Sequence, residues 1–150
     1  MNQIFLHENN FDKVRKLIKE NKDKEIIFSS DDDELNRKIL EKEDINILLL
    51  NLAGRKDFQK QRSSGFNHVL AKLAKKKNVE IGINLDEIIN AESKQKSLIL
   101  ARISQNINIC NKNRLKMKFI PRDKKNERNV YDLKSLGLIL GMPTWMTKSV

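Results

Sequence analysis

Short apolar runs alternate along this chain with longer stretches in which apolar residues recur at every third or fourth position. The short runs are typical of β-strands, and the longer spacing is typical of helices with one buried face. The runs predict strands at residues 3–6, 25–30, 45–50, 79–84 and 117–120. The spacing predicts helices at residues 11–20, from the aspartates at 31–33 through Leu40, from a cap at Ser63 or Ser64 to about Lys77, from a cap at Asn90 through Cys110, and at residues 131–140.

The predicted elements come in the order strand then helix, repeated five times. This alternation indicates an α/β fold with a parallel sheet and right-handed crossovers. The chain has 150 residues, which fits a single domain spanning 1–150. A complete eight-unit barrel needs roughly 200–250 residues. The pattern alone therefore favours an open, doubly wound sheet.

Positive charge is concentrated in two segments of the sequence. The chain carries a net charge of +10. Residues 54–78 hold eight basic residues and one acidic residue, and residues 112–128 hold eight basic and two acidic residues. Residues 1–50 are acidic, with nine basic and twelve acidic residues. Two such segments indicate binding patches for a polyanion rather than an evenly solvated surface.

The first basic segment contains a predicted amphipathic helix. At about 100° per residue, Phe66, Val69, Leu70 and Leu73 lie on one face. The opposite face presents His68, Lys72 and Lys75, next to Lys76. Such a row could be an ordinary solvated face, but four more cations precede it in a polar loop, which favours binding to phosphates: Arg55, Lys56, Lys60 and Arg62.

The two segments have different positions relative to the predicted sheet. The loop at residues 54–61 follows the strand that ends at Leu50, and a second set of cations follows the strand that ends at Ile120. Both sets should emerge at the carboxyl ends of the strands, where α/β proteins bind ligands. The second set is Arg122, Lys124, Lys125 and Arg128. Residues 75–77 and 112–118 precede strands and belong to the opposite end.

Enzymatic signatures are sparse. The only histidines are His7 and His68, too few for the multi-histidine metal cluster of a barrel hydrolase. The aspartates at 31–33 fit helix capping better than a metal site, and Cys110 lies on an apolar helical stripe as a core thiol. With Tyr131 and Trp145 as the only large polar aromatics, no platform for stacking single-stranded bases is evident.

The chain also lacks signals for export or membrane insertion. No stretch approaches the roughly 20 apolar residues that span a bilayer. The first six residues lack the features of a signal peptide, and a single cysteine excludes an internal disulfide. These features predict a cytoplasmic protein with no membrane partner.

Four segments carry a family resemblance. They are Gly-Arg-Lys-Asp at 54–57, Ser-Gly-Phe-Asn-His-Val-Leu-Ala-Lys at 64–72, Lys-Asn-Val-Glu-Ile-Gly-Ile-Asn at 77–84, and Asp-Leu-Lys-Ser-Leu-Gly-Leu-Ile-Leu-Gly-Met at 132–142. In sequence and order they closely resemble archaeal ribonuclease P protein component 3, the counterpart of the thirty-kilodalton subunit of eukaryotic ribonuclease P and MRP. The resemblance runs from about Ile26 onward.

The resemblance implies a TIM-barrel-like fold, shortened at the N-terminus to about five βα units, in place of the open sheet. It implies a subunit that binds ribonuclease P RNA and supports endonucleolytic removal of 5′ leaders from precursor tRNA. The catalytic RNA would use Mg²⁺, and this chain would bind no cofactor or metal. The implied protein partner is component 2, the Pop5-like subunit, in a heterotetramer. Arg55, Lys56, His68 and Lys72 stand in the matching motifs and are the implied RNA contacts.

One departure from the family concerns the last helix. The family often has Pro-Arg-Asp-Leu there, whereas this chain has Val-Tyr-Asp-Leu at 130–133, so Arg128 or Arg122 would have to replace the missing arginine. The alternative function is a small barrel metal-dependent phosphoesterase or other hydrolase, which would need several His and Asp ligands at strand ends. Charge alone also permits a DNA-binding protein.

Overall fold

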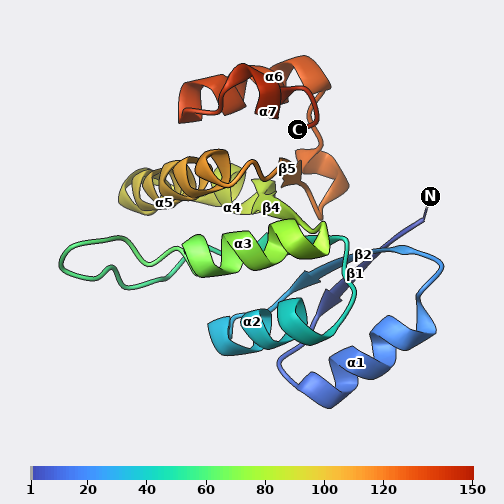
Figure 1. The fold of residues 1–150 in the computed structure, drawn as a ribbon. Helices are drawn as coiled ribbons and strands as arrows, with labels where there is room; N and C mark the ends of the chain where they lie inside the picture. The colour runs from blue at the N-terminus through green and yellow to red at the C-terminus, as the bar shows by residue number, and fades with distance from the viewer. Residues whose placement is uncertain (1) are drawn as a thin grey trace.

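The computed structural model describes residues 2–150 as alternating strands and helices (Figure 1). The strands are β1 (Gln3–His7), β2 (Glu25–Ser29), β3 (Ile47–Leu50), β4 (Glu80–Asn84) and β5 (Met117–Ile120). The helices are α1 (Phe11–Glu20), α2 (Asp33–Lys42), α3 (His68–Lys77), α4 (Leu85–Asn90), α5 (Ser93–Lys112), the 3-10 turn η1 (Lys124–Asn126), α6 (Val130–Leu140) and α7 (Thr144–Thr147).

The five strands form one parallel sheet in the order β1-β2-β3-β4-β5. Each strand lies beside the one before it, so right-handed crossovers place every connecting helix on the same side of the sheet. In Figure 1 the helices follow one another in chain order, from α1 at the bottom to α6 at the top. A doubly wound sheet would reverse its strand order. The structure therefore confirms the barrel-like fold and not the open doubly wound sheet.

The two faces of the sheet bury different residues. Leu6, Phe28, Leu48, Ile81 and Phe119 pack into the large core beneath the helices. The neighbouring positions point the other way and form a separate buried cluster to which the helices contribute nothing: Ile27, Ile47, Leu49 and Ile120, with Phe5 packed against them. Side chains on this inner face can be buried only if the sheet curls over them, as in a barrel.

Gly82 makes room at the centre of this inner cluster. A Cβ atom at this position would lie 3.0 Å from both the Ile47 and Leu49 side chains and 3.2 Å from Ile120. The absence of a side chain therefore allows large residues from β3 and β5 to meet across β4. In the described residues, β1 and β5 are the edge strands of the sheet.

Helix starts show where the sequence patterns succeeded and where they failed. Asp32 caps α2 by accepting hydrogen bonds from the backbone N–H groups of Glu34 and Leu35, which confirms capping by the aspartate run. The predicted caps at Ser63 and Ser64 were wrong, because Asn67 caps α3. The predicted cap at Asn90 was also wrong, because Asn90 is the last residue of α4 and α5 begins at Ser93. The sequence pattern predicted neither α4 nor α7.

Candidate nucleic-acid interface

The segment that joins β3 to α3, residues 51–67 (the β3–α3 loop), leaves the carboxyl end of β3 without regular secondary structure. In Figure 1 it projects to the left, beyond the N-terminal end of α3. Connections of this length inside a domain are uncommon and usually are either functional or disordered. Hydrogen bonds from side chains of α5 and α2 decide between these two cases here.

Arg102, on α5, fixes the outgoing half of the loop. Its side chain is 1% exposed. The guanidinium donates to the carbonyl oxygens of Leu52 at 2.8 Å and Arg55 at 2.7 Å, and to Oδ1 of Asp57 at 3.1 Å. A buried cation is tolerated only where its donors are paired, so the loop backbone must follow these acceptors. The contacts of Arg102 thus define the path of residues 52–57.

Asp57 connects the two halves of the loop. Besides Arg102, its carboxylate accepts from the Ser63 N–H at 2.9 Å and from Nη1 of Arg62 at 3.4 Å. The hydrogen bond from Arg102, with that from the Ser63 N–H, holds the pKa of Asp57 below its ordinary value. The carboxylate therefore stays ionised and closes residues 57–63 into a loop.

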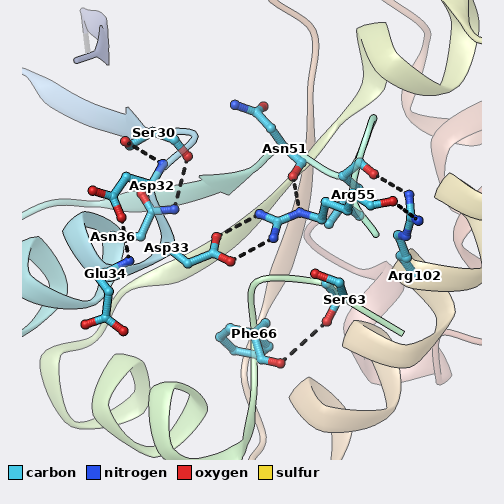
Figure 2. Close-up of polar contacts among 12 residues, drawn as sticks. Ser30, Asp32, Asp33, Glu34, Asn36, Asn51, Arg55, Ser63, Phe66 and Arg102 are labelled. Carbon is cyan, nitrogen blue, oxygen red and sulfur yellow. Dashed lines mark hydrogen bonds and ion pairs between the residues drawn. The ribbon is translucent and has the colours of Figure 1, made fainter. Parts of the chain in front are cut away.

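Arg55 fastens the loop to α2. Its guanidinium donates to both carboxylate oxygens of Asp33, at 2.8 and 2.9 Å, while Nε donates to the Asn51 carbonyl at 2.7 Å (Figure 2). This two-pronged geometry is the strongest form of an arginine–carboxylate pair. Arg55 is only 12% exposed and stabilises the loop. A contact between Arg55 and RNA stays a prediction.

The returning half of the loop is held by amide side chains of α5. Gln105 accepts from the Arg62 N–H at 3.2 Å and donates to the Arg62 carbonyl at 2.9 Å and the Ser64 hydroxyl at 3.1 Å. Asn106 donates to the Ser64 carbonyl at 3.4 Å. These bonds deliver Asn67 to the start of α3, where its side chain accepts from the Leu70 N–H. The loop is thus preformed along its whole length, with Lys56, Lys60 and Arg62 on its outside.

The exposed face of α3 continues the basic surface. His68, Lys72, Lys75 and Lys76 are all exposed, as the sequence predicted. Lys75 donates to the Arg114 carbonyl at 2.9 Å, and the amide nitrogen of Asn113 lies 3.1 Å from Nδ1 of His68.

Val69 was predicted to lie on the buried face of this helix, and that prediction was wrong because Val69 is 64% exposed. The helical spacing was counted from Phe66, which precedes the first helical residue, so the predicted face was rotated.

The second set of cations follows β5 at the same end of the sheet. The Asp86 carboxylate holds its backbone by accepting from the N–H groups of Arg122 and Asp123 and from the Asn126 amide. The cations that the sequence indicated are exposed: Arg122, Lys124, Lys125 and Arg128. The Arg122 guanidinium also lies 5.4 Å from the centre of the Phe5 ring, between the two edge strands. A cation–π contact thus links the ends of β1 and β5.

The polar residues at the carboxyl ends of the strands are largely engaged with one another. Asn84 donates to Asn51 at 3.0 Å, and the Glu87 carboxylate accepts from the Leu52 and Ala53 N–H groups at 2.7 and 2.9 Å. His7 lies 2.8 Å from the Ser29 hydroxyl. This rim supports the basic loop through its hydrogen bonds.

Burial raises the pKa of the Cys110 thiol to about 12, so it is a core thiol, as predicted. Among residues 2–150, no three His, Cys, Asp or Glu side chains come together in a way that could hold a metal ion. None of the helices in that range is long and apolar enough to cross a bilayer.

The sequence did not reveal the side chains that organise the site. Arg102, Asp57, Gln105 and Asp86 carry most of the contacts described above, and none was singled out. One signal was available for Arg102, since it is a charged residue directly beside Ile103 on the buried face of α5.

Fold and site together define a barrel-like α/β protein that presents a preformed basic loop at the carboxyl ends of its strands. A family model described as RNase P subunit p30 matches residues 31–150. Ribonuclease P protein component 3 of Methanocaldococcus jannaschii is 30% identical over 140 residues, covering 91% of this chain and 56% of that protein. The chain belongs to the ribonuclease P subunit p30 family.

Solved structures give the same fold. A chain in the cryo-EM structure of archaeal ribonuclease P with mature tRNA matches with a TM-score of 0.81 at 24% identity, covering 97% of this chain and 62% of that chain. The crystal structure of an uncharacterized protein matches with a TM-score of 0.59 at 9% identity, covering 93% of this chain and 39% of that chain. This chain therefore spans 56% of the length of the component 3 protein and 62% of the length of the ribonuclease P chain that it resembles.

Proposed function

We propose that this chain is a protein subunit of ribonuclease P that binds the catalytic RNA and supports endonucleolytic removal of 5′ leaders from precursor tRNA. Membership of the p30 family supports the assembly, and the likeness to a chain in an archaeal ribonuclease P structure supports the architecture. In this proposal the RNA and its Mg²⁺ ions perform the hydrolysis, and the protein stabilises the RNA fold without binding a cofactor.

The observation that carries the proposal is the preformed β3–α3 loop. Arg102 and Asp57 hold its backbone, so Lys56 and Lys60 are presented on an ordered surface next to the exposed face of α3. Lysines that neutralise phosphates release counterions, and this release drives binding to nucleic acid. A surface that is already ordered loses little conformational entropy when it binds. Recognition of backbone and shape suits structured RNA.

A protein partner is the second part of the proposal. We assign it to component 2, the Pop5-like subunit, in a heterotetramer. Tyr131, Leu138 and Ile139 on α6 are 75%, 54% and 82% exposed. They fall within about 100° of arc on the helix, which makes an apolar stripe facing away from the core. Stripes of this kind mark protein contacts, and α6 is the surface that we assign to component 2.

Reconstituted cleavage tests the function directly. Precursor tRNA is incubated with ribonuclease P RNA and component 2 at moderate Mg²⁺, with and without this chain. We expect the chain to raise the rate of 5′ leader removal. No stimulation would contradict the proposal, and cleavage by the chain without RNA would support the hydrolase alternative.

Salt dependence tests the RNA-binding surface. Lys56→Ala combined with Lys60→Ala should lower the slope of log K against log salt by up to about 2, since each lost phosphate contact removes roughly 0.9. The matched control, Lys16→Ala with Lys19→Ala, removes the same charge from exposed positions on α1 and should leave the slope unchanged. Equal slopes for both double variants would show that the loop lysines are only solvated.

A further inference from the structure

Two large apolar side chains are exposed at one hollow beside the basic loop, Phe58 in the middle of the loop and Val69 in the first turn of α3. Phe58 is 67% exposed and Val69 is 64% exposed. Both line a hollow of about 330 Å³ formed by the β3–α3 loop and the first turns of α2 and α3. That volume lies at the lower end of the roughly 300–1,000 Å³ typical of small-ligand sites. The hollow is thus large enough for one flat ring system with its attached sugar.

The fold holds Phe58 in this exposed position. Its N–H donates to the Gln61 carbonyl at 2.9 Å, closing a turn. Asp57, immediately before it, is bound by Arg102, and Ser63, at the end of the turn, is bound by Asp57. The anchors on both sides order the backbone of the turn, and from this ordered turn the phenyl ring extends into water. Ordered loops that present exposed aromatic side chains are suited to binding a ligand.

Charge and hydrogen-bonding groups around the ring favour a nucleotide over an apolar protein segment. Arg37 and Arg62 line the same hollow and are 53% and 46% exposed. Both guanidinium groups can therefore bind a phosphate at this hollow. Glu34 and Gln61 also line it and offer an acceptor and an amide, the groups that bond to the edge of a base.

We propose that Phe58 stacks on an unpaired nucleobase of the RNA, with Arg37 and Arg62 binding the flanking phosphates. The proposal rests on the RNA-binding function above and assigns a single-nucleotide site within that surface. It also revises the prediction that the chain has no stacking platform. That prediction considered only Tyr131 and Trp145, whereas the exposed ring is the phenylalanine in the middle of the loop.

The test compares two RNAs that have similar charge and differ in pairing. One is a hairpin with 2-aminopurine in its unpaired loop, and the other is a fully paired duplex of the same length. Binding of the full chain is measured by fluorescence anisotropy over a range of KCl concentrations. Phe58→Ala should weaken hairpin binding by roughly 5- to 150-fold, leave duplex binding within about twofold, and leave the salt slope unchanged because no charge is removed.

Two variants serve as controls. Phe58→Trp should restore hairpin affinity, because any aromatic face can stack on a base. Val130→Ala, which trims an exposed apolar side chain outside both the hollow and the α6 stripe, should bind both RNAs like the unchanged protein. In the unchanged protein and in Phe58→Trp, 2-aminopurine fluorescence should be quenched on binding, whereas Phe58→Ala should lose the quench.

The outcomes separate this proposal from the function on which it rests. If the unchanged protein shows no salt-dependent binding to either RNA, the RNA-binding function fails and the stacking site fails with it. If binding and slope are normal but Phe58→Ala matches the unchanged protein, only the stacking site is overturned. An equal loss on hairpin and duplex also overturns it, because Phe58 would then support the loop without contacting a base. A Phe58→Ala variant with normal RNA binding but weaker association with component 2 would reassign the hollow to a protein.

Discussion

Replacing Arg102 with methionine is expected to lower the free energy of unfolding by about 3–5 kcal/mol. The estimate follows from its contacts. The carbonyls of Leu52 and Arg55 would lose their donors, at about 1–3 kcal/mol for each unsatisfied buried group. Asp57 would lose one partner, but it is 24% exposed, so water replaces much of that bond. Methionine has a similar length, so the cavity contributes little.

Urea unfolding followed by circular dichroism measures this change. Arg37→Met is the matched control, because Arg37 is 53% exposed and its ion pair with Glu41 spans four residues of one helix. Such surface pairs contribute roughly 0.3–0.5 kcal/mol. Arg102→Lys should fall between the two, since a single ammonium group keeps the charge but cannot reach all three acceptors.

Local order of the loop is measured separately by limited trypsin digestion, because Lys56, Lys60 and Arg62 are cleavage sites within it. Below the urea concentrations that unfold the protein, Arg102→Met should be cut in the loop much faster than the unchanged chain. A loss in unfolding free energy of less than about 1 kcal/mol, together with unchanged cleavage, would refute the reasoning that Arg102 orders the loop.

Four further predictions follow from individual contacts. Gly82→Ala should lower the free energy of unfolding in urea by about 1–3 kcal/mol, because its Cβ would crowd Ile47 and Leu49. An unchanged free energy would show that the inner cluster is not tightly packed around Gly82. Cys110 should react with a thiol reagent only as fast as the protein unfolds, since the thiol is buried and its pKa is raised to about 12; fast reaction of the native protein would contradict this. The pKa of Asp57 is lowered in the folded protein, so its stabilisation is present above the unfolded value near 3.8 and lost as the pH falls through the folded value. The protection of the Ser63 amide against hydrogen exchange, relative to its intrinsic rate, should therefore fall below about pH 4, and Asp57→Asn should remove this dependence. Ile139→Lys should abolish co-elution with component 2 on gel filtration without changing the melting temperature, as Ile139 is 82% exposed; retained co-elution would exclude the α6 stripe as the interface.

Much of the sheet could be predicted from the sequence because its signals are local. Each strand is a short apolar run, and α1 and β5 have the predicted bounds. The strand order could not be derived from these runs, since apolar parallel strands look alike in either arrangement. The family resemblance supplied the barrel-like fold, and the strand order confirmed it.

The start of α3 shows why boundaries were harder to predict. Ser63, Ser64 and Asn67 are all good caps by residue type. The choice of Asn67 depends on contacts with α5, where Gln105 and Asn106 hold residues 62–64 in the loop. Gly65 then turns the chain with a φ of +67°, a conformation that ends any helix begun earlier. Tertiary hydrogen bonds thus decide where the helix begins, and local propensity alone could not.

The basic residues of the site were visible in the sequence, whereas the residues that position them were not. Charge clustering indicated Lys56, Lys60 and Lys72 without any knowledge of the fold. Arg102 and the carbonyl of Leu52 are separated by fifty positions, and no sequence pattern connects a side chain to a distant backbone oxygen. The same applies to Arg55, whose pairing with Asp33 on α2 no sequence pattern indicated.

The side chains that hold the β3–α3 loop connect the stability of the protein to its affinity for RNA. Ordering one residue of backbone costs roughly 1–2 kcal/mol, so ordering residues 54–62 only upon binding would cost on the order of 10 kcal/mol. A micromolar complex has a total binding free energy of only about 8 kcal/mol. Cations on a disordered loop could therefore not bind tightly through this segment, whereas Arg102 and Asp57 order it during folding. Arg102→Met should accordingly weaken RNA binding although Arg102 is buried and touches no RNA, and its salt slope should fall toward that of the variant lacking Lys56 and Lys60.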